Sequence, residues 1–398
     1  MKSKILAISL FVFTAGVIGF YPIYQSSRAT VVPDPVKPVN NVQAQKIEMV
    51  FALDTTGSMS GMINAAKEKI WSIATNMAQA KSAPEIRIGL VGFRDRGDEY
   101  VTKVIDLSSD LDTVYAQLMD FHAAGGGDHP ESVNQAVYDA VNKISWSKEP
   151  GTYKALFLVG DAPPHMDYQN DVNYSDSINK AKAQGIIFNT IQCGRDRNTL
   201  SHWKQMAMLS GGAFFNVAQN GNAVAMSTPY DRELATLSEE MDKTRLYYGP
   251  KAKMKPKLEK MEATKKLHEK GSIESRARRA AFNSTGSGGL NAIGEGDLVE
   301  DVASGKVAAE SEPVEHLPAA MKPMSPDERK DYVVKTKQKR DELKAKIDKL
   351  AKQRKEYVKQ EMKKRGDADD SLDNQLVGTL RAQAKEKGLD YSDKSIEH

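Results

Sequence analysis

The order of strand-like and helix-like segments between residues 46 and 247 restricts this chain to few folds. Short apolar runs predict β-strands at 46–53, 85–93, 101–107, 153–159, 186–192 and 213–217. Between and after them, the sequence pattern predicts helices at 62–80, 111–121, 131–144, 175–183, 200–209 and 230–247. Strands that alternate with helices build βαβ units. We therefore expect an α/β fold, with a doubly wound, mostly parallel sheet and helices on both faces.

The residues before the first strand predict export. Lys2 and Lys4 precede an apolar stretch, which is the layout of an export signal and is about long enough to span a bilayer. We expect residues 1–24 to be a signal or membrane-anchor segment and the proline-rich residues 25–45 to be a spacer. Because lysines stay on the cytoplasmic side, the rest of the chain would be periplasmic or extracytoplasmic and anchored in the cytoplasmic membrane.

The composition changes after residue 249. Pro250 is a natural break, so we expect the α/β domain to occupy residues 46–249. Residues 250–325 are rich in lysine, glycine and serine and are punctuated by proline, which favours a flexible, irregular region. Residues 326–398 are densely charged and predict a helical tail, so the C-terminal region as a whole should be mainly helical and partly irregular.

The tail contains one clear helical stretch, residues 327–365, which has no glycine or proline. Ser325 and Pro326 precede two acidic residues, as is typical of a helix start. A narrow apolar stripe, interrupted by Arg354, is formed by Leu343, Ile347, Leu350 and Tyr357. The stripe fits a short coiled coil, and with it self-association, or a solvated charged helix.

Predicted strands end in aspartates at Asp54, Asp95 and Asp161. Ligands of open parallel sheets bind beyond the carboxyl ends of the strands. Carboxylates gathered there repel one another unless a cation joins them. Oxygen donors with no cysteine and no evident histidine ligand favour Mg²⁺, with Mn²⁺ or Ca²⁺ as alternatives, over zinc or copper. The 56 basic and 53 acidic residues nearly cancel, so net charge gives no reason to expect a nucleic-acid partner.

The turn after the first strand places an acid and two hydroxyls at alternate positions: Asp54, Thr56 and Ser58. Alternate side chains of an extended turn point the same way and can converge on one ion. Other known sites do not fit this turn. Thr56 stands where a haloacid-dehalogenase-type phosphatase needs a second aspartate, and Met59 stands where a nucleophile elbow needs serine.

Asp54, Thr56 and Ser58 match the D-x-S/T-x-S element of the metal-ion-dependent adhesion site of von Willebrand factor type A (VWA) domains, and the chain resembles that family over about half its length. In the family, a threonine from a later loop and an aspartate after the fourth strand complete the site. The aspartate is Asp161, and Asp128 takes the place of the threonine. The resemblance therefore implies all of these residues as metal ligands, together with a protein partner that presents an acidic side chain to the metal.

The loops GGGDHPE and GDAPPH are similar to those of the VWA domain attached to alpha-kinases. Asp95 and Asp98 are expected to order the metal's waters. The interpretation that follows is a non-enzymatic, metal-dependent module for interaction or adhesion at a bacterial cell envelope. The alternative is a metal-dependent hydrolase that uses His129 or His165 with a metal-bound water, or a component of a kinase-like assembly.

Overall fold

The structure is a computed structural model that describes residues 46–217, 226–365 and 372–391. These residues belong to one unit, residues 43–398. The predicted signal or anchor segment at 1–24 and the predicted spacer at 25–45 lie outside the described residues. Within the described ranges, no helix is long and apolar enough to cross a membrane.

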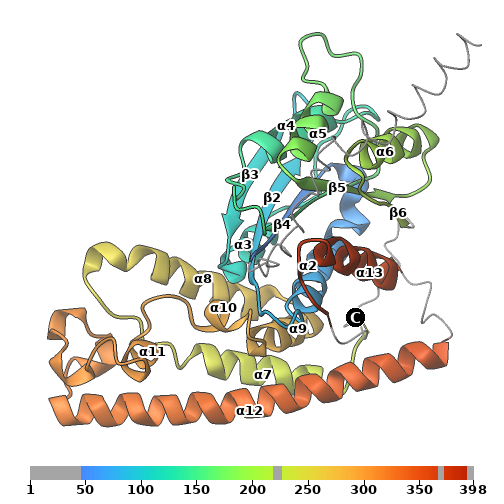
Figure 1. The fold of residues 1–398 in the computed structure, drawn as a ribbon. Helices are drawn as coiled ribbons and strands as arrows, with labels where there is room; N and C mark the ends of the chain where they lie inside the picture. Colours follow the sequence, from blue (N-terminus) through green and yellow to red (C-terminus); the bar gives the residue numbers. More distant parts are fainter. Residues whose placement is uncertain (1–45, 218–225, 366–371, 392–398) are drawn as a thin grey trace, which may run out of the picture. The chain divides into compact units, whose positions relative to one another are not determined.

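A six-stranded sheet in the order β3-β2-β1-β4-β5-β6 forms the centre of the α/β region (Figure 1). The strands are β1 Lys46–Asp54, β2 Glu85–Phe93, β3 Thr102–Ser108, β4 Tyr153–Gly160, β5 Ile186–Cys193 and β6 Phe214–Val217. Neighbouring strands run parallel, except that β2 and β3 are antiparallel. This arrangement confirms the predicted doubly wound, mostly parallel sheet. It also places the ends of β1 and β4 side by side.

Helices cover both faces of the sheet, as predicted. They are α2 Ile63–Met77, α3 Leu111–Leu118, α4 Val133–Asn142, α5 Tyr174–Ala183 and α6 Arg197–Ser210. The next helix, α7 Asp231–Asp242, packs instead against helices of the C-terminal region. Side chains alternate along β1, so Phe51 belongs to the core under α2 and α3 while Ala52 belongs to the core under α4, α5 and α6. The helix predicted at 230–247 is shorter than expected and ends at Asp242.

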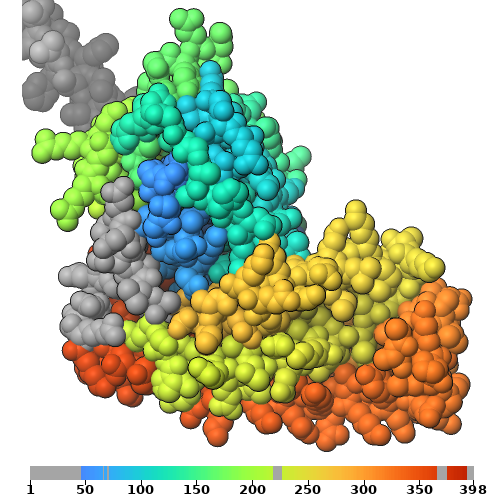
Figure 2. Space-filling view, turned by 180° about the vertical axis from the view of Figure 1, so that it is seen from behind, coloured from blue at the N-terminus to red at the C-terminus, as the bar shows by residue number. Residues whose placement is uncertain are grey.

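The region at 250–325 was expected to be flexible and irregular, but the structure folds much of it into helices. These are α8 Lys255–Lys270, α9 Ile273–Ser284, α10 Gly289–Ile293 and α11 Leu298–Ala303, with 3-10 turns at Lys251–Lys253, Ala309–Ser311, Val314–His316 and Ala319–Met321. Helix α9 packs against α2, and Figure 2 shows its gold surface adjoining the blue of α2. The physical reason is that α8 and α9 use buried charged contacts, which a hydropathy pattern does not reveal.

The tail helix α12 spans Pro326–Arg365 and lies beside α7 (Figure 1). It begins where predicted, and the Ser325 N–H donates a hydrogen bond to the Glu328 carboxylate at 2.7 Å. Leu343 and Ile347 are buried in a cluster with apolar residues of α7 and α9. Arg354, which interrupts the stripe, forms a buried ion pair with Asp231 of α7 at 2.8 Å. The stripe therefore packs within the chain, and the described residues give the predicted coiled coil no support.

The chain then returns to the sheet. Helix α13, Leu372–Lys385, places Leu376 and Leu380 in the same core as Phe51. The Tyr153 hydroxyl of β4 donates to Gln383 Oε1 at 2.8 Å. This part of the charged tail therefore packs on the α/β region.

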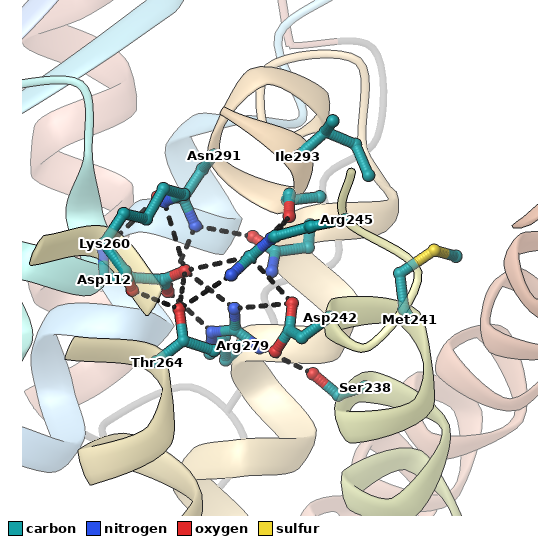
Figure 3. Close-up of polar contacts among 12 residues, drawn as sticks. Asp112, Ser238, Met241, Asp242, Arg245, Lys260, Thr264, Arg279, Asn291 and Ile293 are labelled. Carbon is teal, nitrogen blue, oxygen red and sulfur yellow. Dashed lines mark hydrogen bonds and ion pairs between the residues drawn. The ribbon is translucent and has the colours of Figure 1, made fainter. Parts of the chain in front are cut away.

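A buried ion network joins α3 to α7, α8 and α9 (Figure 3). Both oxygens of Asp112 accept hydrogen bonds from Arg279 of α9, at 2.6 and 2.7 Å. Lys260 of α8 lies 3.3 Å from the same carboxylate, and Asp242 of α7 bonds Arg279 at 2.8 Å. Burial alone raises the pKa of Asp112, but the charges of Arg279, Lys260 and Arg245 outweigh it and hold the pKa well below its usual range.

Candidate metal centre

The turn after β1 brings Asp54, Thr56 and Ser58 together as predicted. Thr56 Oγ1 donates to Asp54 Oδ1 at 2.6 Å and lies 3.2 Å from Ser58 Oγ. Ser58 Oγ in turn donates to Asp161 Oδ1 at 2.9 Å. Because Asp161 follows β4, the neighbour of β1, one continuous row of side-chain oxygens crosses the carboxyl edge of the sheet.

Close backbone packing makes this row possible. Gly160 ends β4, and a Cβ at this position would lie 2.8 Å from the Cβ of Asp54. A side chain there would push Asp54 away from β4. The glycine loop is fixed to the same turn, because the Gly57 N–H donates to the Gly125 carbonyl at 3.2 Å.

Asp54 lies in an electrostatically costly position. It is buried, and its Oδ2 has no hydrogen-bond partner among the described residues. Burial is the main cause that raises the pKa of Asp54 to about 7, with a further contribution from the charge of Asp161 and an opposing one from the hydrogen bonds of Thr56. A bound cation would remove this cost. The oxygen donors of this row therefore fit a hard divalent cation such as Mg²⁺.

Glu131 is a site residue that the sequence analysis did not single out. Its Oε2 is buried without a hydrogen-bond partner among the described residues. Burial, followed by the charges of Asp54 and Asp95, raises the pKa of Glu131 to about 9. The Glu131 N–H donates to the Pro163 carbonyl at 2.9 Å, which ties the glycine loop to the loop after β4. The sequence feature that could have identified Glu131 is its position, three residues after Asp128 in the loop that was expected to reach the metal.

The Asp128 carboxylate lies beside a histidine. This carboxylate is largely exposed, and Oδ2 is 3.7 Å from Nε2 of His165. Asp95 Oδ2 is 3.4 Å from the same nitrogen. The structure thus joins Asp54, Thr56, Ser58 and Asp161 in one row and gathers Asp95, Asp128 and His165 in a second cluster.

The α/β region resembles a known protein family. Residues 48–219 match the family model for the von Willebrand factor A domain. This region is therefore similar to a VWA domain. Helices α7 to α13 all lie after the matched residues.

Other proteins contain sequences similar to this region. Human von Willebrand factor A domain-containing protein 7 is 41% identical over 173 residues, which cover 41% of this chain and 18% of that protein. A putative ariadne-like RING finger protein of Acanthamoeba polyphaga mimivirus, R811, is 24% identical over 151 residues, which cover 37% of this chain and 14% of that protein. The chain therefore matches less than a fifth of the length of these two relatives.

The comparison with solved structures found proximal thread matrix protein 1 from the mussel byssus, with 13% identity and a TM-score of 0.35, over 44% of this chain and 43% of that chain. The SpRpn10 VWA domain has 14% identity and a TM-score of 0.35, over 46% of this chain and 95% of that chain.

Asp98 holds the glycine loop of this region in place. Its carboxylate accepts hydrogen bonds from the N–H groups of Gly126, at 3.1 and 3.2 Å, and of Asp95, at 3.1 Å. Gly125 has φ +73°, and a Cβ there would lie 2.3 Å from Asp98 Oδ1. Asp98 therefore orders the backbone beside the candidate metal centre.

Proposed function

We propose that the VWA domain binds a partner protein through a divalent cation held by Asp54, Thr56, Ser58 and Asp161. The observation that carries the proposal is the buried Asp54 carboxylate, whose Oδ2 has no partner among the described residues while Oδ1 begins the row of oxygens. Mg²⁺ suits these donors best, with Mn²⁺ and Ca²⁺ as alternatives. Asp128 is left out of this set because its carboxylate lies beside His165.

The row of oxygens leads from the interior to the surface. Asp54 and Thr56 are buried, whereas Ser58 is exposed. A cation held by this row would be reachable from solvent on the side of Ser58. An acidic side chain of a partner protein is the ligand that suits such a position, because it supplies oxygen and neutralises charge. The role proposed for this site is binding and not catalysis.

We further propose that this module works at a cell envelope, outside the cytoplasm, and is attached to the membrane through residues 1–24. The support for this location is the pair of lysines before the N-terminal apolar stretch. The likeness of the GGGDHPE and GDAPPH loops to the domain attached to alpha-kinases supports a common metal chemistry of these loops.

The direct test is calorimetric titration of Mg²⁺ into the metal-stripped full-length chain. The wild type should show one saturable Mg²⁺ site. Asp54→Asn should abolish Mg²⁺ binding, because the substitution removes the negative charge and keeps the size of the side chain. Asp176→Asn is a matched control, because this aspartate is exposed in the first turn of α5. If Asp54→Asn binds Mg²⁺ as tightly as the control, the proposed site is wrong.

A further inference from the structure

His165 is a buried histidine with one ring nitrogen that makes no hydrogen bond to a described residue. The residue is 2% exposed, and its Nε2 makes no hydrogen bond with any described residue. A buried polar atom without a partner is costly, so this nitrogen needs an explanation. It faces Asp95 Oδ2 at 3.4 Å and Asp128 Oδ2 at 3.7 Å. The three ligand atoms all lie within 4.8 Å of one another.

The other ring nitrogen fixes which tautomer His165 adopts. Nδ1 lies 2.8 Å from Oδ1 of Asp167. An ionised carboxylate only accepts hydrogen bonds, so Nδ1 carries the hydrogen and the neutral ring presents a lone pair at Nε2. Histidines that bind metals usually donate their second N–H to a carboxylate in this way. Asp167 thus acts as a positioning residue for Nε2.

Asp95 is held in place as firmly as His165. The Tyr168 hydroxyl donates to Asp95 Oδ2 at 2.6 Å, and the Ser132 hydroxyl donates to Oδ1 at 2.8 Å. The Tyr168 ring also stacks on the His165 ring, with the centroids 3.9 Å apart. Such outer contacts orient metal ligands and reduce the movement needed on binding.

We propose that Asp95, Asp128 and His165 form a second metal site, of the zinc type. Ligand atoms bound about 2.0–2.1 Å from one tetrahedral Zn²⁺ stand about 3.3 Å apart, which is close to the 3.4 and 3.7 Å found here. An imidazole nitrogen with two carboxylate oxygens suits Zn²⁺ better than Mg²⁺. Because the Asp128 side chain is largely exposed, solvent reaches this cluster from that side, and a water would supply the remaining ligand.

This inference does not rest on the proposed interaction function, because the two sites share no ligand. The competing explanation is a protonated His165 that bridges two aspartates without any metal. The two explanations differ in whether the folded chain takes up zinc while its Mg²⁺ site is filled.

The test uses the metal-stripped full-length chain in saturating Mg²⁺, titrated with Zn²⁺ against a chromophoric zinc chelator. We expect one tight zinc per chain. Loss of a residue that only orients a metal ligand lowers the metal affinity by about 10–100-fold, and Asp167→Asn should lower the zinc affinity within that range. His165→Asn and Asp128→Asn remove a ligand, so each should lower the zinc affinity by more than that. Tight binding that survives both His165→Asn and Asp128→Asn overturns the proposal, as does the absence of tight zinc binding in the wild type.

Two controls separate this site from its neighbours. Asp54→Asn should abolish Mg²⁺ binding and leave zinc binding unchanged; loss of zinc in this variant would place the ion in the other site and refute the proposal. His129→Asn should also retain zinc, because this exposed histidine faces Asp196 at 3.6 Å. If His165→Asn does not fold, the surface variant Asp128→Asn decides, and circular dichroism establishes folding in each case.

Discussion

The guanidinium of Arg279 binds both carboxylate oxygens of Asp112, at 2.6 and 2.7 Å, although 167 positions separate the two residues. Asp112 lies in α3 of the α/β region and Arg279 lies in α9 of the C-terminal region. Both side chains are buried. Because a buried charge needs its partner, this contact makes the stability of the two regions interdependent.

Arg279→Met should therefore lower the free energy of unfolding by about 3–5 kcal/mol, since it leaves Asp112 buried with fewer cations. Urea unfolding of the full-length chain, followed by circular dichroism, measures the change. Lys337→Met is the control, because Lys337 pairs with Asp341 on the exposed surface of α12 and such pairs contribute at most about 1 kcal/mol. Equal losses in the two variants would contradict the structural role of the Asp112 pair.

The same network predicts a dependence on pH. The cations around Asp112, namely Arg279, Lys260 and Arg245, overcome its burial and hold its pKa well below the usual range, and Asp242 faces the same group. Since the folded pKa lies below the unfolded value, the stabilisation is present above the unfolded pKa of about 4 and is lost as pH falls through the folded pKa. The difference in unfolding free energy between wild type and Asp112→Asn should shrink as pH falls below about 4. A difference that stays constant down to the acid transition would count against this assignment.

Leu343 tests whether the apolar stripe of α12 serves this chain or a second copy. Leu343 is 3% exposed in a cluster with residues of α7 and α9. Leu343→Ala should cost about 2–5 kcal/mol of stability and leave the molar mass in light scattering unchanged. Val334→Ala, at a position 58% exposed on the same helix, should have little effect. A fall in molar mass with unchanged stability would show instead that the stripe joins two chains.

Gly125 tests the glycine loop beside the candidate metal centre. Its φ of +73° and its approach to Asp98 leave no room for a methyl group. Gly125→Ala should destabilise the chain by about 1–2 kcal/mol or more and weaken Mg²⁺ binding, because Asp98 must move and release the loop. Gly127→Ala is a matched control in the same loop, since a Cβ there meets nothing within 4 Å. Calorimetry and thermal unfolding of both variants give the comparison, and equal Mg²⁺ affinities would exclude this role of Gly125.

The sequence by itself determined the sheet and the row of oxygens at its edge. Strand and helix patterns are local, and the right-handed βαβ connection leaves few ways to arrange them. Asp54, Thr56 and Ser58 lie within one turn, so their spacing alone brings them together. Asp161 could be added because parallel strands end at the same edge of a sheet.

Only the tertiary structure decided which loop residues meet beyond that edge and what becomes of the C-terminal half. Asp128 lies near His165 and Asp95 because hydrogen bonds to Asp98 and Pro163 fix the path of the glycine loop. The path of a loop has no periodic sequence pattern from which it could be predicted. The basic helices α8 and α9 are joined to α3 because Asp112 neutralises Lys260 and Arg279 inside the protein. A charged side chain looks like a surface residue in the sequence until its buried partner is known.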